Sequence, residues 1–352
     1  PNTVFSLLFF NGCLLVILTD FDNMPTVTKP CAAMLEAMMK ADVGDDVYGE
    51  DPTINKLEDL AAKMLGTQEA IFCTSGTQSN LLALLAHCER GDEYIVGQQA
   101  HTYRYEGGGA AVFGSIQPQP LDFEADGTLS LEKVSQFIKP DDFHFANTSL
   151  LCLENTQAGK VLPLEYLGNA RKFTIDKGLM LHLDGARIFN AAAKLKVDVK
   201  EITKYFDTIS CCLSKGLGAP VGSVLCGPKN LIKKARRWRK VLGGGMRQAG
   251  ILAAAGIFAL SNNVQRLYKD HENALTLAKG LAGINGINID MKMVQTNIIF
   301  ADIKADMESL CDFLKKKGII IDNSNKLRIF THLDISGEDI DCTIKAFKAF
   351  FY

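Results

Sequence analysis

The chain carries the stretch LSKGLGAPVGS at residues 213–223, which places Lys215 in a loop of small residues directly after an apolar run at 207–213. Most lysines that follow a strand are surface residues. Here the small neighbours leave room for a flat group beside the amine, and apolar surroundings favour its neutral form. Because a neutral amine is a nucleophile, the stretch indicates a reactive lysine at the end of a buried strand.

A second stretch, LMLHLDGAR at residues 179–187, is typical of a buried strand that ends in the carboxylate of Asp184. Taken alone, an Asp-Gly pair is usually a turn. A lysine and an aspartate at two strand ends together suggest pyridoxal phosphate. This cofactor needs a lysine for its Schiff base and an acid against its pyridine nitrogen, because the protonated ring is the electron sink.

Residues 70–88 predict a strand, a turn and a buried helix, with Ser75, Gly76 and Thr77 in the turn. Backbone N–H groups at the start of such a helix, together with the helix dipole, can hold a phosphate group. Serine and threonine before a helix are more often plain caps, so this assignment depends on Lys215. The loop GGGMRQ at 243–248 fits the same layout, in which strand ends meet at one crevice.

Further continuous apolar runs lie at 94–96, 149–153, 208–213 and 221–226, and each is followed by a helix or a turn. They predict an α/β fold in which helices cover both faces of the sheet. The tail changes to an α+β pattern. We therefore expect an atypical apolar leader at 1–25, a large domain at 26–255 and a small C-terminal domain at 256–352. The leader is interpreted as non-native or truncated, with a short buried segment or an anchor as alternatives.

From about Thr26 to its end, the chain resembles the low-specificity L-threonine aldolases among the fold-type I pyridoxal phosphate enzymes. Besides the stretches quoted above, the resemblance rests on TVTKP at 26–30, VGDDVYGEDPT at 43–53 and ENT at 154–156. It implies a large domain with a mostly parallel seven-stranded sheet between helices, and a smaller C-terminal α+β domain. It also implies a homotetramer built as a dimer of dimers.

The activity that the resemblance implies is retro-aldol cleavage of L-threonine and L-allo-threonine, which are β-hydroxy-α-amino acids, to glycine and acetaldehyde. Lys215 would carry the cofactor, and Asp184 would contact its pyridine nitrogen. Two alternatives stay open. One is another fold-type I lyase, such as a β-eliminating amino-acid lyase, and the other is a protein that binds the cofactor with impaired turnover.

The resemblance also assigns residues around the cofactor and the substrate. Ser214 and Arg247 would add contacts to the phosphate. Arg187 and Arg328 would hold the substrate carboxylate, for which the planar guanidinium is suited. Without the resemblance, Arg328 on a late strand would be taken for an ordinary solvated arginine.

Two histidines and two tyrosines complete the expected site. His101 would stack on the cofactor ring, and His144 would reach toward the substrate hydroxyl, although a histidine among aromatic residues is more often part of a core. Tyr48 and Tyr105 would line the pocket. The base that takes the hydroxyl proton stays open between His101, His144 and an ordered water, because spacing does not fix tautomer or reach.

The chain departs from the family pattern at two places. The family usually has Ser-Asp directly before Thr-Val-Thr, where this chain has Met24 and Pro25. Because that serine contacts the substrate carboxylate in the family, part of the substrate clamp is in doubt. The histidine expected after the ENT motif is Gln157 here.

Composition excludes several classes of protein. A length of 352 residues with 47% hydrophobic residues supports a large core, and a net charge of −2 offers no field for nucleic acid or an anionic membrane. The basic run at 233–240 is interpreted as a solvated helix face or a subunit contact. The ten cysteines and six histidines show no zinc spacing. We therefore expect a cytoplasmic protein with reduced thiols and no structural metal. That it is an enzyme with a small amino-acid substrate is what the resemblance implies.

Overall fold

The computed structural model of the chain describes Leu15–Val16 and residues 28–352. These residues form two compact units, of which the larger is Thr28–Tyr268 and the smaller contains Lys269–Tyr352. The expected leader, with Met24 and Pro25, falls almost wholly outside the described residues. The domain boundaries expected from the sequence stay a prediction.

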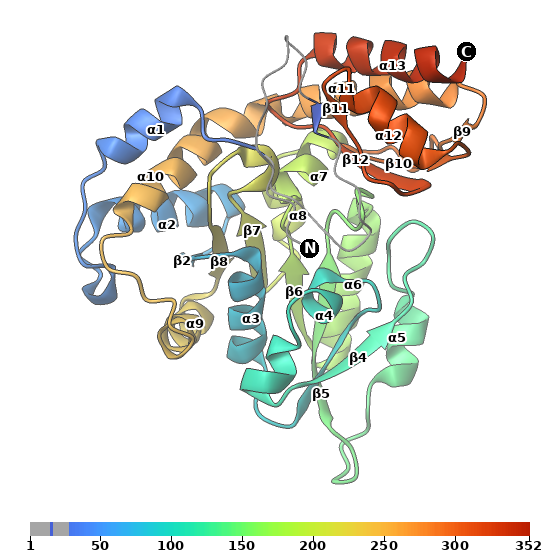
Figure 1. Cartoon of the computed structure of the whole chain (residues 1–352). Coiled ribbons are helices and arrows are strands. Elements are labelled where there is room, and N and C mark those ends of the chain that lie inside the picture. Colours follow the sequence, from blue (N-terminus) through green and yellow to red (C-terminus); the bar gives the residue numbers. More distant parts are fainter. Residues whose placement is uncertain (1–14, 17–27) are drawn as a thin grey trace. The chain divides into compact units, whose positions relative to one another are not determined.

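The larger unit contains a seven-stranded sheet in the order β2-β8-β7-β6-β5-β3-β4 (Figure 1). Only β8 runs antiparallel to its neighbours. The strands are β2 (Glu69–Cys73), β3 (Asp92–Gly97), β4 (Gln117–Leu121), β5 (Asn147–Glu154), β6 (Met180–Asp184), β7 (Thr208–Cys212) and β8 (Ser223–Gly227). The expected fold class, a mostly parallel seven-stranded α/β sheet with a smaller α+β part, is confirmed.

The sheet is covered by helices on both faces because neighbouring side chains of a strand point to opposite sides. Phe72 of β2 packs into the cluster that contains Leu57 and Ile188, whereas Ile71 packs with Leu82 and Ile232. The helices of this unit are α1 (Ala32–Met39), α2 (Pro52–Leu65), α3 (Gly76–His87), α4 (His101–Arg104), α5 (Leu131–Phe137), α6 (Leu164–Lys177), α7 (Ile188–Leu195), α8 (Lys200–Thr203), α9 (Lys229–Val241) and α10 (Gly250–Phe258). Short 3-10 and π turns join them at Asp46–Tyr48, Ala110–Gly114, Lys215–Leu217, Ala259–Asn263 and Val264–Arg266.

One strand of the sheet was not expected from the sequence. The β4 segment, QPQPL, contains Pro118 and Pro120, which cannot donate backbone hydrogen bonds to a ladder. The strand is possible because it lies at the edge of the sheet and pairs only with β3. Proline is tolerated on such an edge, where one side of the strand needs no partner.

The parallel strands β2, β3, β5, β6 and β7 all end at the same edge of the sheet. At this edge lie Glu154, which ends β5, and Asp184, which ends β6 and pairs with Glu154 in the ladder. The turns after β2, β3 and β7 lead into α3, α4 and Lys215–Leu217. In open sheets of this kind the crevice outside the carboxyl ends of the strands is the usual place for a ligand.

The smaller unit has its own core around an antiparallel sheet in the order β12-β10-β9. Its elements are α11 (Leu267–Ala282), β9 (Ile287–Asn288), β10 (Ile298–Ile303), α12 (Met307–Lys315), β11 (Ile319–Ile320), β12 (Lys326–Phe330) and α13 (Gly337–Phe351). The backbone of β1 (Leu15–Val16) pairs in parallel with β11. None of the helices in the described part of the chain is both long and apolar enough to cross a membrane.

Candidate active site

Lys215 begins the turn after β7 and has a backbone conformation that residues other than glycine rarely adopt. Its φ is +66°, and the hydroxyl of Thr28 donates to its carbonyl oxygen at 3.1 Å. Its Nζ lies 3.6 Å from Sγ of Cys212, the last residue of β7. Strained backbone of this kind collects at functional sites, where the surrounding structure must hold it in place.

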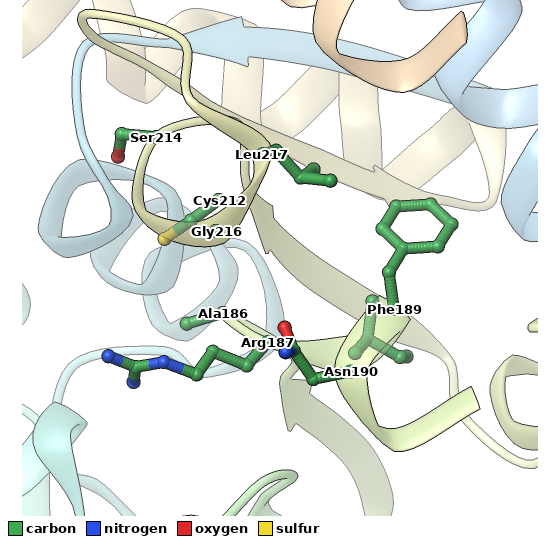
Figure 2. A pocket seen from close by; sticks show the side chains of 9 residues that line it. Ala186, Arg187, Phe189, Asn190, Cys212, Ser214, Gly216 and Leu217 are labelled. Atoms are coloured by element: carbon green, nitrogen blue, oxygen red, sulfur yellow. The ribbon is translucent and has the colours of Figure 1, made fainter. Parts of the chain in front are cut away.

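A small pocket lies between the turn at Lys215 and the start of α7. Figure 2 shows the β7 turn on one side and Arg187 and Asn190 on the other. The pocket is lined by Ala186, Arg187, Ile188, Phe189, Asn190, Cys212, Ser214, Gly216 and Leu217. Burial lowers the pKa of Arg187 from its usual value, against the opposing effect of Glu154 and Asp184. The predicted residues Ser214 and Arg187 therefore line one pocket, and Lys215 is the neighbour of Ser214 and Gly216 in the turn beside it.

The turn of Ser75, Gly76 and Thr77 lies against the same strand end. Ser75 is the N-cap of α3, where its hydroxyl accepts from the backbone N–H of Gln78 at 3.1 Å. A Cβ atom on Gly76 would stand 2.9 Å from Sγ of Cys212, so the turn approaches β7 closely enough to require glycine. The start of α3 and the amine of Lys215 thus both lie close to the Cys212 thiol.

Asp184 is buried, and both of its carboxylate oxygens accept hydrogen bonds. Oδ1 accepts from the backbone N–H of Ala186 at 3.1 Å, and Oδ2 accepts from the side-chain amide of Asn80 at 2.9 Å. These two bonds fix the plane of the carboxylate at the end of β6. Asn80 was not singled out in the sequence, because nothing marks its place on α3 as facing β6.

His101 starts α4 and is held by two carboxylates. Its backbone N–H donates to Oε2 of Glu154 at 2.9 Å, and its Nδ1 lies 2.7 Å from Oε1 of Glu106. Burial lowers the pKa of His101, but the bond to Glu106 and the charge of Asp184 outweigh it, so the pKa is raised. Burial and the neighbouring charge of Asp184 raise the pKa of Glu154 to about 7. The ring of Tyr105 lies 5.8 Å from that of His101.

Tyr48 and Arg247 form an exposed pair in the larger unit. The guanidinium of Arg247 lies 5.8 Å from the centre of the Tyr48 ring and pairs with Asp45. The glycine loop before Arg247 contacts α3, since a Cβ on Gly244 would meet Nε2 of Gln78. The pair therefore lies near the first turn of α3, although both side chains are open to solvent.

His144 is not brought to this edge within one chain, and Arg328 belongs to the other compact unit. His144 is exposed, paired with Asp142, and precedes the first residue of β5 by three positions. Because β5 has eight residues, His144 lies on the order of 20 Å from Glu154 at the other end of that strand. Arg328 lies on β12 of the smaller unit, beside the rings of Phe300 and Phe330. The roles of both residues stay predictions.

Gln157, the second departure from the family pattern, follows β5 and is buried. Its backbone pairs with Lys160, whose Nζ contacts the carbonyl oxygen of Ala125 at 3.3 Å. A Cβ on Gly127 would lie 3.4 Å from the Gln157 amide oxygen. The glutamine therefore packs into the loop at residues 125–128.

A buried histidine behind the site makes stability depend on pH. Burial lowers the pKa of His182 from 6.5 to about 3, and the charge of His87 adds to this. Between these values the unfolded chain binds the proton and the folded chain does not. The contribution of His182 to the free energy of unfolding is therefore complete above pH 6.5. Below that pH it falls by about 1.4 kcal/mol for each pH unit.

We expect the stability advantage of the wild type over His182→Gln to be constant above that pH and to shrink as the pH falls toward about 4. Urea unfolding of both proteins from about pH 7.5 to about pH 4.5 measures this difference. Other titrating groups, including Glu154 and Glu106, largely cancel in the comparison. A difference in free energy of unfolding that stays the same across the range would show that His182 does not titrate as inferred.

Comparison with known proteins agrees with this geometry. Residues 23–305 match the model of the family described as beta-eliminating lyase. The chain is 56% identical to the low specificity L-threonine aldolase of Escherichia coli K12, over 92% of this chain and 97% of that protein. It is 42% identical to low-specificity L-threonine aldolase 1 of Arabidopsis thaliana, over 92% and 94% of the two chains.

A solved structure of a threonine aldolase from Leishmania major shares the fold. The TM-score is 0.80 at 20% identity, covering 96% of this chain and all of that one. At this identity the likeness concerns the fold alone. The curated relatives carry the assignment, and they confirm the resemblance stated from the sequence: the chain belongs to the low-specificity L-threonine aldolases within the beta-eliminating lyase family.

Proposed function

We propose that this protein is a pyridoxal phosphate-dependent lyase that cleaves L-threonine and L-allo-threonine to glycine and acetaldehyde. The observation that carries the proposal is the sheet edge at which Lys215, Asp184 and His101 meet the start of α3. A relative that is 56% identical over nearly its whole length is named for threonine aldolase activity.

The residues at this edge fit the cofactor by their chemistry. Pyridoxal phosphate needs an amine, a carboxylate for its ring nitrogen and a site for its phosphate. Lys215 offers the amine, and Asp184 offers a carboxylate whose plane two hydrogen bonds fix. Ser75, Gly76 and Thr77 at the N-terminus of a 12-residue helix, with Ser214, would hold the phosphate. Arg247 would add a further phosphate contact.

When bound, the cofactor supplies an electron-withdrawing ring that stabilises the charge left on Cα as the Cα–Cβ bond breaks. Asp184 would keep the ring nitrogen protonated, because an ionised carboxylate favours the nearby positive charge. Arg187 would bind the substrate carboxylate and so orient the bond that breaks. Tyr105 would line the pocket beside His101. Arg328 and Tyr48 stay predicted substrate contacts.

We assign the removal of the hydroxyl proton to His101. Its imidazole lies at this edge and interacts with the charges of Asp184 and Lys215. An ordered water held by His101 could carry the same proton. His144 would act in this site only from another copy of the chain, since it lies at the opposite end of β5.

A dimer of dimers and a cytoplasmic location belong to the same proposal. The exposed pair of Tyr48 and Arg247 supports a subunit contact, because both are predicted site residues that remain open to solvent. The nine cysteines of the described residues are all free thiols, as in a reducing compartment. Light scattering of the active enzyme tests the oligomer, and a fully active monomer would contradict it.

The proposed activity is tested by incubating the holoenzyme with L-threonine and L-allo-threonine and measuring glycine and acetaldehyde in parallel. We expect the two products in equal amounts. The family name favours a second candidate, β-elimination, which would instead release ammonia and a 2-oxo acid from the same amino acids. Ammonia without glycine would support that activity, and cofactor absorbance with neither product would indicate a protein without turnover.

A further inference from the structure

Asn80 joins the carboxylate of Asp184 to the carboxylate of Glu106, which in turn contacts His101. Its side-chain amide nitrogen lies 2.9 Å from Oδ2 of Asp184 and 2.8 Å from Oε1 of Glu106. The same Oε1 lies 2.7 Å from Nδ1 of His101. One ligand atom each of His101, Glu106 and Asp184 lies within 4.8 Å of the other two. The two carboxylates and the imidazole are therefore joined through a single buried amide.

The orientation of this amide follows from its neighbours. If the Asn80 oxygen faced Asp184 and Glu106, three acceptors would meet in a buried space. With the nitrogen there, both N–H groups find acceptors, and Oδ1 lies 3.2 Å from Nε2 of His182. His182 is neutral because burial lowers its pKa to about 3, so Nε2 must carry its one proton to donate to Asn80.

The remaining hydrogen bonds behind His182 are consistent with this assignment. Nδ1 of His182 then accepts from the hydroxyl of Thr208 at 2.8 Å, and that hydroxyl accepts from Nε2 of His87 at 2.7 Å. Nδ1 of His87 has no hydrogen-bond partner. This is consistent with a neutral ring whose proton lies on Nε2, because Nδ1 then carries a lone pair and no N–H group. A single chain of donors and acceptors therefore fixes the amide of Asn80 from behind.

Glu106 in turn fixes the ring of His101. The Glu106 side chain is only 3% exposed, and its Oε1 receives both the Asn80 amide and the His101 ring. An oxygen that already accepts from Asn80 is best matched by a second donor, so the proton of neutral His101 lies on Nδ1. The lone pair then lies on Nε2, the nitrogen available for proton transfer.

We propose that Glu106 and Asn80 are positioning residues: Glu106 holds His101 with its proton on Nδ1, and Asn80 ties this pair to Asp184. The inference rests on the proposed function only in the role it gives to His101. It predicts that loss of the Glu106 charge disturbs the titration of His101 as well as catalysis. The titratable groups that act on His101 are Glu106, Asp184, Glu154 and Lys215.

The test compares Glu106→Gln with wild type, His101→Asn and the double variant, all as holoenzymes. The pH dependence of His101 modification by diethyl pyrocarbonate, read by peptide mass spectrometry, reports when the ring is neutral. The midpoint for His101 should move to lower pH in Glu106→Gln. The value of kcat should fall by about 10- to 100-fold, as for other partners that orient a functional side chain. Asp142→Asn removes a carboxylate from a surface histidine, His144, and should leave the His101 profile unchanged.

Glu106 acts through His101 if Glu106→Gln lowers kcat in the wild type but hardly at all in His101→Asn. An unchanged midpoint, or kcat losses that multiply in the double variant, would overturn the proposal. Should Glu106→Gln not fold, Glu106→Asp keeps the charge but moves the carboxylate oxygen away from His101 and Asn80. The same two measurements then apply to this variant. The modification profile needs no turnover, so it decides the question even if threonine is not the substrate.

Discussion

Replacing Lys215 with alanine is expected to abolish covalent attachment of pyridoxal phosphate and to lower glycine release by more than about 10⁴-fold. That loss corresponds to about 5 kcal/mol of transition-state stabilisation. Lys215 is the amine beside the Ser75 turn and Cys212, in a backbone conformation that only its surroundings maintain. No residue that lines the adjacent pocket can take over its chemistry, because these residues offer a guanidinium, a thiol and neutral polar or apolar groups but no amine.

Borohydride reduction followed by peptide mapping measures the attachment, and product assay measures the activity. Lys196→Ala is the matched control: Lys196 also has a positive φ, +56°, but is exposed at the end of α7. The control should retain both the reducible cofactor and the activity. If the reduced cofactor in Lys215→Ala maps to another lysine, the assignment of the amine is wrong.

Much of the sheet could be predicted because its central strands are continuous apolar runs. Such runs can be recognised as strands buried on both faces without knowing which strands they pair with. The edge strand β4 was missed for the opposite reason, since Pro118 and Pro120 argue against a strand unless the edge position is known. Local sequence therefore identified the other six strands, including β2 at the opposite edge, but not the edge strand that contains two prolines.

The core face of α2 shows a similar limit. The apolar residues of α2 mark a core face, to which Leu60 and Met64 contribute as partly buried residues, but the structure also buries the charged Glu58. Glu58 is buried because it accepts from the backbone N–H of Phe72 and pairs with Arg236 of α9. Periodicity counts apolar residues, so it cannot foresee a charged residue that finds its partners on distant elements.

Some residues of the candidate site could be predicted from the sequence, and others could not. Lys215 and Asp184 could be found because each follows a recognisable strand, and the ends of parallel strands meet. Asn80 and Glu106 could not, since their importance arises only where α3, the residues after α4 and β6 come together. Glu106 follows His101 by five residues, and that spacing alone is no signal. Only the folded arrangement shows that one amide joins both carboxylates.

Replacing Asp184 with asparagine is expected to weaken cofactor binding about 10- to 100-fold and to lower kcat/KM by more than about 10³-fold. A hydrogen bond to a charged group contributes about 1.5–3 kcal/mol, which sets the binding loss. The larger kinetic loss follows because a neutral amide cannot keep the ring nitrogen protonated, so the ring no longer draws charge from Cα. The substitution preserves the size of the side chain, and therefore separates charge from packing.

Fluorescence titration of the apoenzyme with pyridoxal phosphate measures the dissociation constant, and the threonine assay measures kcat/KM. Asp207→Asn is the matched control, because Asp207 is also a hydrogen-bonded aspartate of this sheet but precedes β7 at the opposite edge, paired with Arg171. That variant should lose stability without losing cofactor affinity. Near-normal turnover in Asp184→Asn would show that the Asp184 carboxylate does not act on the ring nitrogen. The hydrogen bond from Asn80 would then serve only to keep a buried charge satisfied.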